Sequence, residues 1–381
     1  MTERRIGAPF VRSSEEVVFS PNERLLLNLI RKEDRVSRAD LARKTGLTVQ
    51  SVVRLVDGLV ARGFLLTGEK MQLAGPGQPS VSIRLATDAA FTLGVSIMTD
   101  AVSLVVADWT GRVRASAYDR VDVADRPATL EHLKSRLGSL AQTAAIDRQR
   151  IFGVGVAITG FFVGRGRINS PASMGSWALT DLETELSSAF NLPVWVENDG
   201  TAAAAGESLY GLGRRYRTFA YIYIGAGLGG GLVLEGQPWR GLHGNAGEFT
   251  GLLSGSDRPN RPTLTLLLGL VRERGVEVSS ISELVERFDP EWPGVETWLE
   301  RSRPALTAIT SAIGAVMDPE AIVIGGRLPS GLARMLADRA GFHAEPLRDQ
   351  ERPFPLVLPA EAAGDAATLG AAAIPLQEHF F

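Results

Sequence analysis

The chain has no cysteine, few histidines and no long apolar run, and each absence narrows what the protein can be. Without cysteine there is neither a disulfide framework nor a zinc site built on thiolates. The 4 histidines are scattered and form no metal-ligand spacing. No apolar run approaches the roughly 18–20 residues of a membrane span, and the N-terminal residues lack the apolar core of a secretory signal. We therefore expect a cytoplasmic protein that makes no membrane contact.

The composition is that of a globular protein, with 45% hydrophobic and 22% charged residues. A chain of 381 residues is long enough for two or three domains of roughly 100–200 residues each. Charge is unevenly distributed. Residues 1–85 contain 14 Lys and Arg against 9 Asp and Glu, and residues 86–381 contain 26 against 34, which gives formal charges of +5 and −8. This asymmetry predicts that the two parts meet different partners.

Three short helices are predicted near the N-terminus. Residues 22–34 place Leu25, Leu26, Leu29 and Ile30 on one helical stripe. A second helix begins at Ser37, within a capping-box pattern, and ends near Gly46. A third helix begins at Thr48, a suitable N-cap residue, and runs to about residue 62 with apolar residues at the helical period. Two helices joined by a short turn that contains glycine match the helix-turn-helix motif, whose second helix enters the major groove of DNA.

Two strands of a β-wing are predicted next, at residues 64–67 and 80–85. The candidate DNA-contacting residues of the third helix are Thr48, Gln50, Ser51 and Arg54, of which Gln50 and Arg54 are the types that contact adenine and guanine edges. Lys44 and Arg38 are expected to contact phosphate, and Gln78 is the candidate in the wing. A structural three-helix bundle that binds no nucleic acid is the alternative for this segment.

From about residue 88 the pattern alternates between strands and helices. The predicted strands are 91–97, 102–108, 113–117, 151–158, 221–224, 230–234 and 321–326, and the predicted helices are 128–144, 263–272, 279–288 and 294–316. This alternation indicates an α/β body with two related lobes. We therefore expect an N-terminal arm over 1–20, a winged helix-turn-helix domain over 21–86 and a two-lobed body over 87–381 that binds an effector and dimerises.

The segment VENDGTAAAAGE, residues 196–207, follows a short apolar strand. Asn198 and Asp199 should therefore lie at the C-terminal tip of that strand and at the start of a helix. Ligands bind at this position in open α/β sheets. The alternative is that one of these side chains only caps the helix.

The body resembles the ROK family (repressors, open reading frames and sugar kinases), which is built on the two-lobed, actin-like, ribonuclease H-like ATPase fold. The ordered motifs that carry the resemblance are ITGFF at 158–162, Trp177, VENDGTAAAAGE at 196–207, GAGLGGGLVLEG at 225–236, RGLHGNAGEF at 240–249, DPEAIVIGGRLP at 318–329 and GDAATLGAAAI at 364–374. The winged helix resembles that of the family's repressors. Together the two resemblances cover nearly the whole chain.

The resemblance assigns Asp199 to the position of the catalytic base in the family's kinases. A kinase also needs groups that handle phosphate. The family's first phosphate loop, Asp-x-Gly-Gly-Thr, falls on residues 96–100, where Ser96, Met98 and Asp100 depart from it. Ala226 replaces a threonine of the second loop. We therefore expect no kinase catalysis and no bound ATP.

The sugar-binding positions of the family are better kept. Asn198, Asp199 and Glu248 match residues that hydrogen-bond sugar hydroxyls, Gly160 matches a glycine of that pocket, and Ser173 falls where many members carry asparagine. The family's zinc-binding histidine and cysteine-rich loop are replaced in this chain, so no zinc is expected.

These patterns predict a sequence-specific DNA-binding regulator that represses genes of carbohydrate uptake or catabolism. A sugar or sugar-like effector would bind in its degenerate kinase cleft, and a homodimer or tetramer would bind an inverted-repeat operator. Two alternatives remain open: an active ATP-dependent sugar kinase with an attached DNA-binding domain, and a DNA-binding protein regulated by protein partners.

Overall fold

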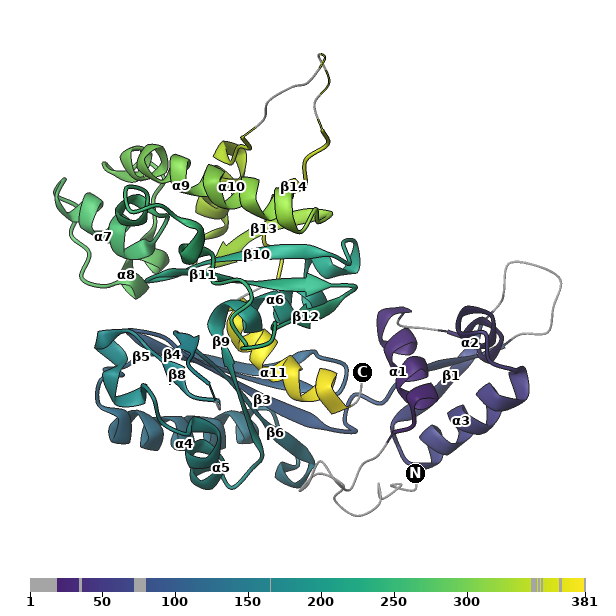
Figure 1. Ribbon diagram of the computed structural model, residues 1–381. Helices are drawn as coiled ribbons and strands as arrows, with labels where there is room; N and C mark the ends of the chain where they lie inside the picture. The colour runs from purple at the N-terminus through teal and green to yellow at the C-terminus, as the bar shows by residue number, and fades with distance from the viewer. Residues whose placement is uncertain are drawn as a thin grey trace.

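The computed structural model describes residues 19–33, 36–71, 80–164, 166–343, 348, 350, 352–362 and 365–379. A small winged domain lies beside a larger body that consists of two stacked lobes (Figure 1). Within the described part of the chain, no helix combines the length and the apolar character that crossing a membrane requires.

The winged domain has the predicted helix-turn-helix arrangement. Its elements are α1 (Pro21–Glu33), α2 (Arg38–Thr45), α3 (Val49–Ala61) and the antiparallel strands β1 (Leu65–Met71) and β2 (Ser80–Leu85). The Ser37 hydroxyl accepts from the Asp40 N–H and the Asp40 carboxylate accepts from the Ser37 N–H, which completes the capping box at α2. Gly46 ends α2 with φ 72°, a conformation that favours glycine, and the Thr48 hydroxyl accepts from the Ser51 N–H at the start of α3.

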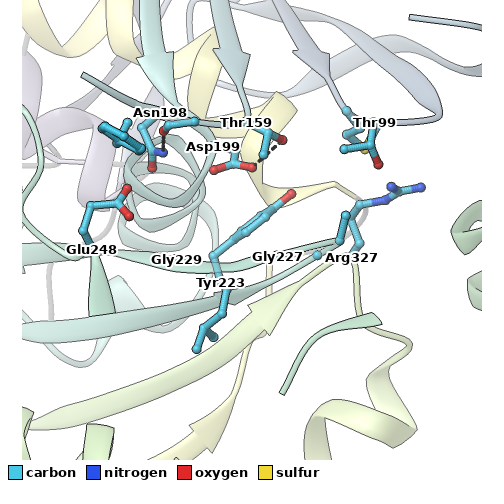
Figure 2. Close-up of a pocket in the computed structure, with 15 residues that line it drawn as sticks. Thr99, Thr159, Asn198, Asp199, Tyr223, Gly227, Gly229, Glu248 and Arg327 are labelled. Atoms are coloured by element: carbon cyan, nitrogen blue, oxygen red, sulfur yellow. Dashed lines mark hydrogen bonds between the residues drawn. The ribbon is translucent and has the colours of Figure 1, made fainter. Parts of the chain in front are cut away.

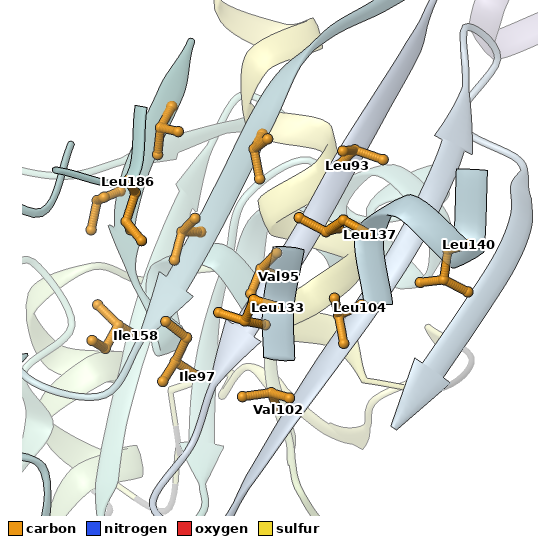
Figure 3. Close-up of a cluster of buried hydrophobic side chains, with 14 of the residues drawn as sticks. Leu93, Val95, Ile97, Val102, Leu104, Leu133, Leu137, Leu140, Ile158 and Leu186 are labelled. Carbon is orange, nitrogen blue, oxygen red and sulfur yellow. The ribbon is translucent and has the colours of Figure 1, made fainter. Parts of the chain in front are cut away.

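The first lobe contains a five-stranded sheet of order β5-β4-β3-β6-β9. Its elements are β3 (Phe91–Ile97), β4 (Ala101–Asp108), β5 (Val113–Arg120), α4 (Arg126–Thr143), β6 (Ile151–Ile158), β7 (Phe161–Phe162), β8 (Ile168–Asn169), α5 (Leu182–Phe190), β9 (Val194–Asn198) and α6 (Asp199–Tyr210). Strand β3 pairs antiparallel with β4 and parallel with β6. These three central strands are buried along their whole length, which explains their continuous apolar sequence. Leu133 and Leu137 of α4 and Leu186 of α5 pack against one face of this sheet (Figure 3).

The second lobe repeats this topology with a sheet of order β12-β11-β10-β13-β14. Its elements are β10 (Phe219–Ile224), β11 (Leu228–Leu234), β12 (Gln237–Trp239), α7 (Leu264–Arg272), α8 (Ile281–Arg287), α9 (Val295–Val316), β13 (Ala321–Gly326), α10 (Ser330–Arg339), β14 (Leu356–Pro359) and α11 (Ala366–His379). Strand β10 pairs antiparallel with β11 and parallel with β13, as β3 does with β4 and β6. The body is therefore the predicted two-lobed, actin-like α/β fold.

Two helices cross between the lobes and join them (Figure 1). Helix α6 follows the last strand of the first sheet and α11 follows β14 of the second lobe, and the two helices pack mainly against each other. Helix α6 also packs on β11 of the second lobe, and α11 also packs on β3 and β6 of the first. Glycine permits these close approaches. A Cβ at Gly155 would lie 1.8 Å from the Ala371 carbonyl oxygen, and one at Gly370 would lie 1.6 Å from the Ala202 carbonyl oxygen. The lobes are thus held by direct backbone contact.

The winged domain packs against the first lobe through aromatic side chains. The Phe19 and Phe64 rings are 4.9 Å apart, and each contacts Trp109 of the β4–β5 turn, with centroid separations of 6.4 and 5.3 Å. Leu376, near the end of α11, belongs to the same buried cluster. The winged domain therefore shares a hydrophobic core with the body and with α11, one of the helices that cross between the lobes.

Candidate functional site

A cavity of about 120 Å³ lies between the two lobes, and side chains from both of them line it (Figure 2). The first lobe contributes Thr159, Gly160, Asn198 and Asp199, and the second contributes Tyr223, Glu248 and Arg327. Four of the five predicted effector residues are thus brought together. Because pockets for drug-sized ligands measure roughly 300–1,000 Å³, this cavity admits a larger ligand only if the lobes move apart.

Asn198 acts as the cap of α6. Its Oδ1 accepts from the N–H groups of Gly200 and Thr201 at 2.8 and 3.1 Å, and its Nδ2 donates to the carbonyl of Gly160. Gly160 has φ 142°, and a Cβ there would lie 2.7 Å from the Asn169 carbonyl oxygen, so the position requires glycine. The capping interpretation is therefore correct for Asn198, and the same amide fixes one wall of the cavity.

Asp199 is 7% exposed and faces the cavity. Its Oδ2 accepts from the Thr159 hydroxyl at 2.8 Å, and its Oδ1 accepts from the Gly200 N–H at 2.9 Å. Burial raises the pKa of Asp199 to about 7, against the lowering effect of these two hydrogen bonds. Burial also raises the pKa of Glu248. A carboxyl group that is partly protonated near neutral pH can both donate to and accept from a ligand hydroxyl.

Tyr223 is a site residue that the sequence analysis missed. Its side chain is buried, and its hydroxyl has no hydrogen-bond partner among the described residues. In Figure 2 this hydroxyl points toward Asp199 and Thr159. A buried phenol hydroxyl without a partner is energetically costly, so a polar group in the cavity would stabilise it. Its sequence context, the apolar strand FAYIYI, gave no sign of this role.

Ser173 lies away from the cavity, contrary to the prediction. It sits in the 3-10 helix Ala172–Trp177 and is exposed, whereas Met174 and Trp177 of the same turn are buried. The Trp177 indole N–H donates to the Val123 carbonyl at 2.7 Å. The inward packing of Met174 and Trp177 leaves Ser173 facing solvent, so it is not one of the cavity-lining residues.

Residues 96–100, which correspond to the first phosphate loop, comprise the end of β3 and the turn that follows it. Ser96 is fully buried and its hydroxyl has no partner among the described residues. Met98 is 3% exposed and forms part of the cavity wall. Asp100 forms an ion pair with Arg327 of the second lobe at 2.7 Å. In the described part of the chain, no group of three or more histidine, aspartate or glutamate side chains is placed to hold a metal ion.

Helix α3 presents the two predicted base-contacting residues to solvent. Gln50 and Arg54 are exposed and one helical turn apart, and Arg54 forms no ion pair within the described residues. The Thr48 hydroxyl accepts from the Ser51 N–H and donates to the Ser51 hydroxyl at 2.9 Å. The Thr48 and Ser51 hydroxyls, both predicted to contact DNA, therefore form part of the N-terminal cap of α3.

The predicted phosphate contacts are held in ion pairs within the winged domain. Arg38 donates to Asp57 at 2.6 Å, and Lys44 pairs with Glu33. Exposed pairs of this kind contribute little to stability, so either cation can leave its partner for a phosphate. Gln78, the predicted wing contact, lies outside the described residues.

Comparison with known proteins agrees with this architecture. The family model "ROK family" matches residues 92–255, and the model "MarR family" matches residues 19–68. The chain is 30% identical over 370 residues to the uncharacterized protein y4fQ of Sinorhizobium fredii, an alignment that covers 95% of this chain and 92% of that protein. The chain belongs to the ROK family.

Other relatives are repressors and kinases. The xylose repressor of Bacillus subtilis is 25% identical over 229 residues, which is 60% of this chain and 59% of the repressor. A solved ROK family transcriptional regulator, described as a homologue of the E. coli MLC protein, is 20% identical with a TM-score of 0.65, covering 94% of this chain and 96% of its own. A ROK glucokinase from Streptomyces griseus, solved with glucose and AMPPNP, is 22% identical with a TM-score of 0.60, covering 76% of this chain and all of its own. At these identities the two structures establish the fold alone.

Proposed function

We propose that this protein is a transcriptional repressor that binds operator DNA through α3 and responds to a sugar or sugar-like effector in the cavity between its lobes. The observation that carries this proposal is that one chain joins an exposed Gln50 and Arg54 to a cleft lined by Asn198, Asp199 and Glu248. The xylose repressors to which the chain is similar support the same assignment. Genes of carbohydrate uptake or catabolism are the expected targets, and the cytoplasm is the expected location.

The chemistry of the cavity suits a small polyhydroxylated ligand. Asp199 and Glu248 can accept hydrogen bonds from hydroxyl groups, and the Tyr223 hydroxyl can donate to one or accept from one. In this role Asp199 binds the ligand, and no alkoxide has to be generated. Removal of its carboxylate should weaken effector binding by about 1.5–3 kcal/mol, the range for hydrogen bonds to a charged group.

The alternative, an active sugar kinase, is disfavoured by the phosphate-handling positions. Ser96, near the end of β3, stands where the family has an acidic metal ligand, Met98 in the following turn stands where a phosphate loop needs glycine, and Ala226 provides no hydroxyl. We therefore expect neither ATP nor zinc as a cofactor. Incubation with ATP, magnesium and a broad set of sugars should give no ADP above the control without enzyme. Sugar-dependent release of even about one ADP per second, a low but ordinary enzymatic rate, would establish the kinase instead.

Operator binding should require a symmetric homodimer, or a tetramer, because one recognition helix contacts too few base pairs for genomic specificity. Two copies of α3 would enter major grooves about one helical turn, or a multiple of it, apart. Footprinting should therefore show an inverted repeat. A single unrepeated half-site, or a monomer on DNA in gel filtration, would contradict this arrangement.

A thermal-shift panel of sugars, polyols and sugar phosphates tests the proposed effector site. A selective ligand should raise the unfolding temperature of the wild type in proportion to its occupancy. Asp199→Ala should lose most of this shift. Ser173→Ala, which changes an exposed side chain outside the cavity, should keep it. Equal shifts in the wild type and Asp199→Ala would show that the effector binds elsewhere.

A further inference from the structure

The cavity-lining Arg327 also belongs to a network that joins the two lobes, which we call the lobe clamp: Asp100 and Tyr118 from the first lobe, and Ser282 and Arg327 from the second. Asp100 lies in the turn between β3 and β4, and Arg327 directly follows β13. The Arg327 Nη1 donates to Asp100 Oδ1 at 2.7 Å, and the Arg327 side chain is only 6% exposed. The Asp100 side chain is 24% exposed, so this ion pair is more shielded from solvent and salt than a pair of fully exposed side chains.

The other members of the lobe clamp complete the coordination of both charges. Asp100 Oδ2 accepts from the Ser282 hydroxyl at 2.8 Å and from the Ser282 N–H at 3.0 Å. The Arg327 Nη2 donates to the hydroxyls of Tyr118 and Ser282 at 2.8 and 3.0 Å. Every donor to the Asp100 carboxylate among these contacts belongs to the second lobe.

The charge state of Asp100 agrees with this geometry. Burial raises the pKa of Asp100, but the Arg327 charge and the hydrogen bonds from Arg327 and Ser282 lower it more, so the pKa lies below its ordinary value. Asp100 is thus an anion at neutral pH, held by a buried guanidinium and a hydroxyl. Guanidinium groups bind carboxylates and phosphates by the same charge-assisted hydrogen bonds.

We propose that Arg327 and Ser282 form an oxyanion-binding site in the second lobe and that this chain fills the site with its own Asp100. While the carboxylate is bound, phosphate or a carboxylate of another molecule is excluded, and the lobes are held together over the small cavity. Space for an external anion exists beside the site, because Tyr118, Ser282 and Arg327 also line a second cavity of about 860 Å³. This inference requires neither DNA nor an effector and does not rest on the proposed function.

A neighbouring ion pair provides a matched control. Arg120 of β5 pairs with Glu286 of α8 and so joins the same two elements as Tyr118 and Ser282. Its side chains are 47% and 70% exposed. Water competes with such a pair, so Glu286→Gln removes an interlobe contact and one carboxylate of the second cavity but leaves Arg327 paired with Asp100.

The test uses inorganic phosphate as the probe, with ionic strength held constant by chloride, and measures affinity by calorimetry and by thermal shift. Asp100→Ala should bind phosphate about ten- to hundredfold more tightly than the wild type, the fold-change of one charge-assisted hydrogen bond. Adding Arg327→Gln to this variant should remove the gain, and Glu286→Gln should behave like the wild type. Without phosphate, Asp100→Ala should also exchange amide hydrogens faster in α8 and in the β3–β4 turn.

The proposal is overturned if Asp100→Ala binds phosphate no more tightly than the wild type, or if the double variant binds it as tightly as Asp100→Ala. Should Asp100→Ala fail to fold, Asp100→Asn provides the same test, because it keeps an acceptor for Ser282 but loses the charge that pairs with Arg327. Failure of the wild type and its variants to bind phosphate as expected would not contradict operator or effector binding, which are measured with different ligands, so the two proposals fail separately.

Discussion

Replacing Asp199 by asparagine should make the free energy of unfolding depend less on pH. Burial raises the pKa of Asp199 from 3.8 to about 7. Between these values the folded protein binds a proton that the unfolded chain has lost, so the free energy of unfolding falls as pH rises. This rise of about three pKa units corresponds to roughly 4 kcal/mol of unfolding free energy, of which roughly 3 kcal/mol is lost between about pH 5 and about pH 8. Asparagine is neutral throughout and mimics the protonated acid beside Thr159 and Gly200.

Urea unfolding of the wild type and of Asp199→Asn, each at about pH 5 and about pH 8, gives the change in unfolding free energy with pH for each protein. The decrease in unfolding free energy with rising pH should be smaller in Asp199→Asn by roughly 3 kcal/mol, and the variant should be the more stable protein at the higher pH. Glu286→Gln, which removes an exposed carboxylate, should keep the wild-type dependence. If Asp199→Asn shows the same pH dependence as the wild type, the Asp199 carboxyl group is not desolvated and the argument about its charge is wrong.

Three further predictions concern the lobe junction, the DNA contacts and metal content. Gly155→Ala places a Cβ 1.8 Å from the Ala371 carbonyl oxygen and should lower the unfolding free energy by about 3 kcal/mol or more. Gly269→Ala, with no atom within 4 Å of the new Cβ, should cause no such loss. Equal stabilities of the two variants would contradict the close packing of the lobes. Arg54→Ala should cost roughly 1–3 kcal/mol of operator affinity and relax the preference at one base position per half-site, whereas Lys44→Ala should mainly reduce the salt dependence of DNA binding. If Arg54→Ala weakens binding to all DNA sequences equally, Arg54 makes no base contact. Elemental analysis of protein purified without added metal should give well under one zinc per chain, and stoichiometric zinc that leaves only on unfolding would refute this expectation.

Features with short-range causes could be predicted from the sequence. The capping box at Ser37 and the cap at Thr48 each depend on residues within one turn, so the boundaries of α2 and α3 followed from the local sequence. The buried central strands are continuous apolar runs, which predicted β3 and β6 to the residue. At the edge strand β5, where burial alternates, the prediction ended at residue 117, whereas the strand continues to Arg120.

Features with long-range causes could not be predicted. Arg327 and Asp100 are 227 positions apart, and nothing in either segment identifies the other as its partner. The Tyr223 hydroxyl lies inside an apolar strand, so its polar role depends on which face of β10 meets the cavity. The motifs placed Asn198, Asp199 and Glu248 together correctly, but Ser173 was misplaced because its direction is set by the neighbouring buried side chains.

The central claim is that occupancy of the cavity controls DNA binding, and fluorescence anisotropy of a labelled operator duplex tests it most directly. Titration of the effector found in the thermal-shift panel should change the operator affinity of the wild type by about five- to 150-fold, the usual range of allosteric coupling. Asp199→Ala should bind the operator as the wild type does without effector and should respond to the effector far less. If the effector changes the operator affinity of Asp199→Ala as much as that of the wild type, or if the wild type binds a scrambled duplex as tightly as the operator, the account is contradicted.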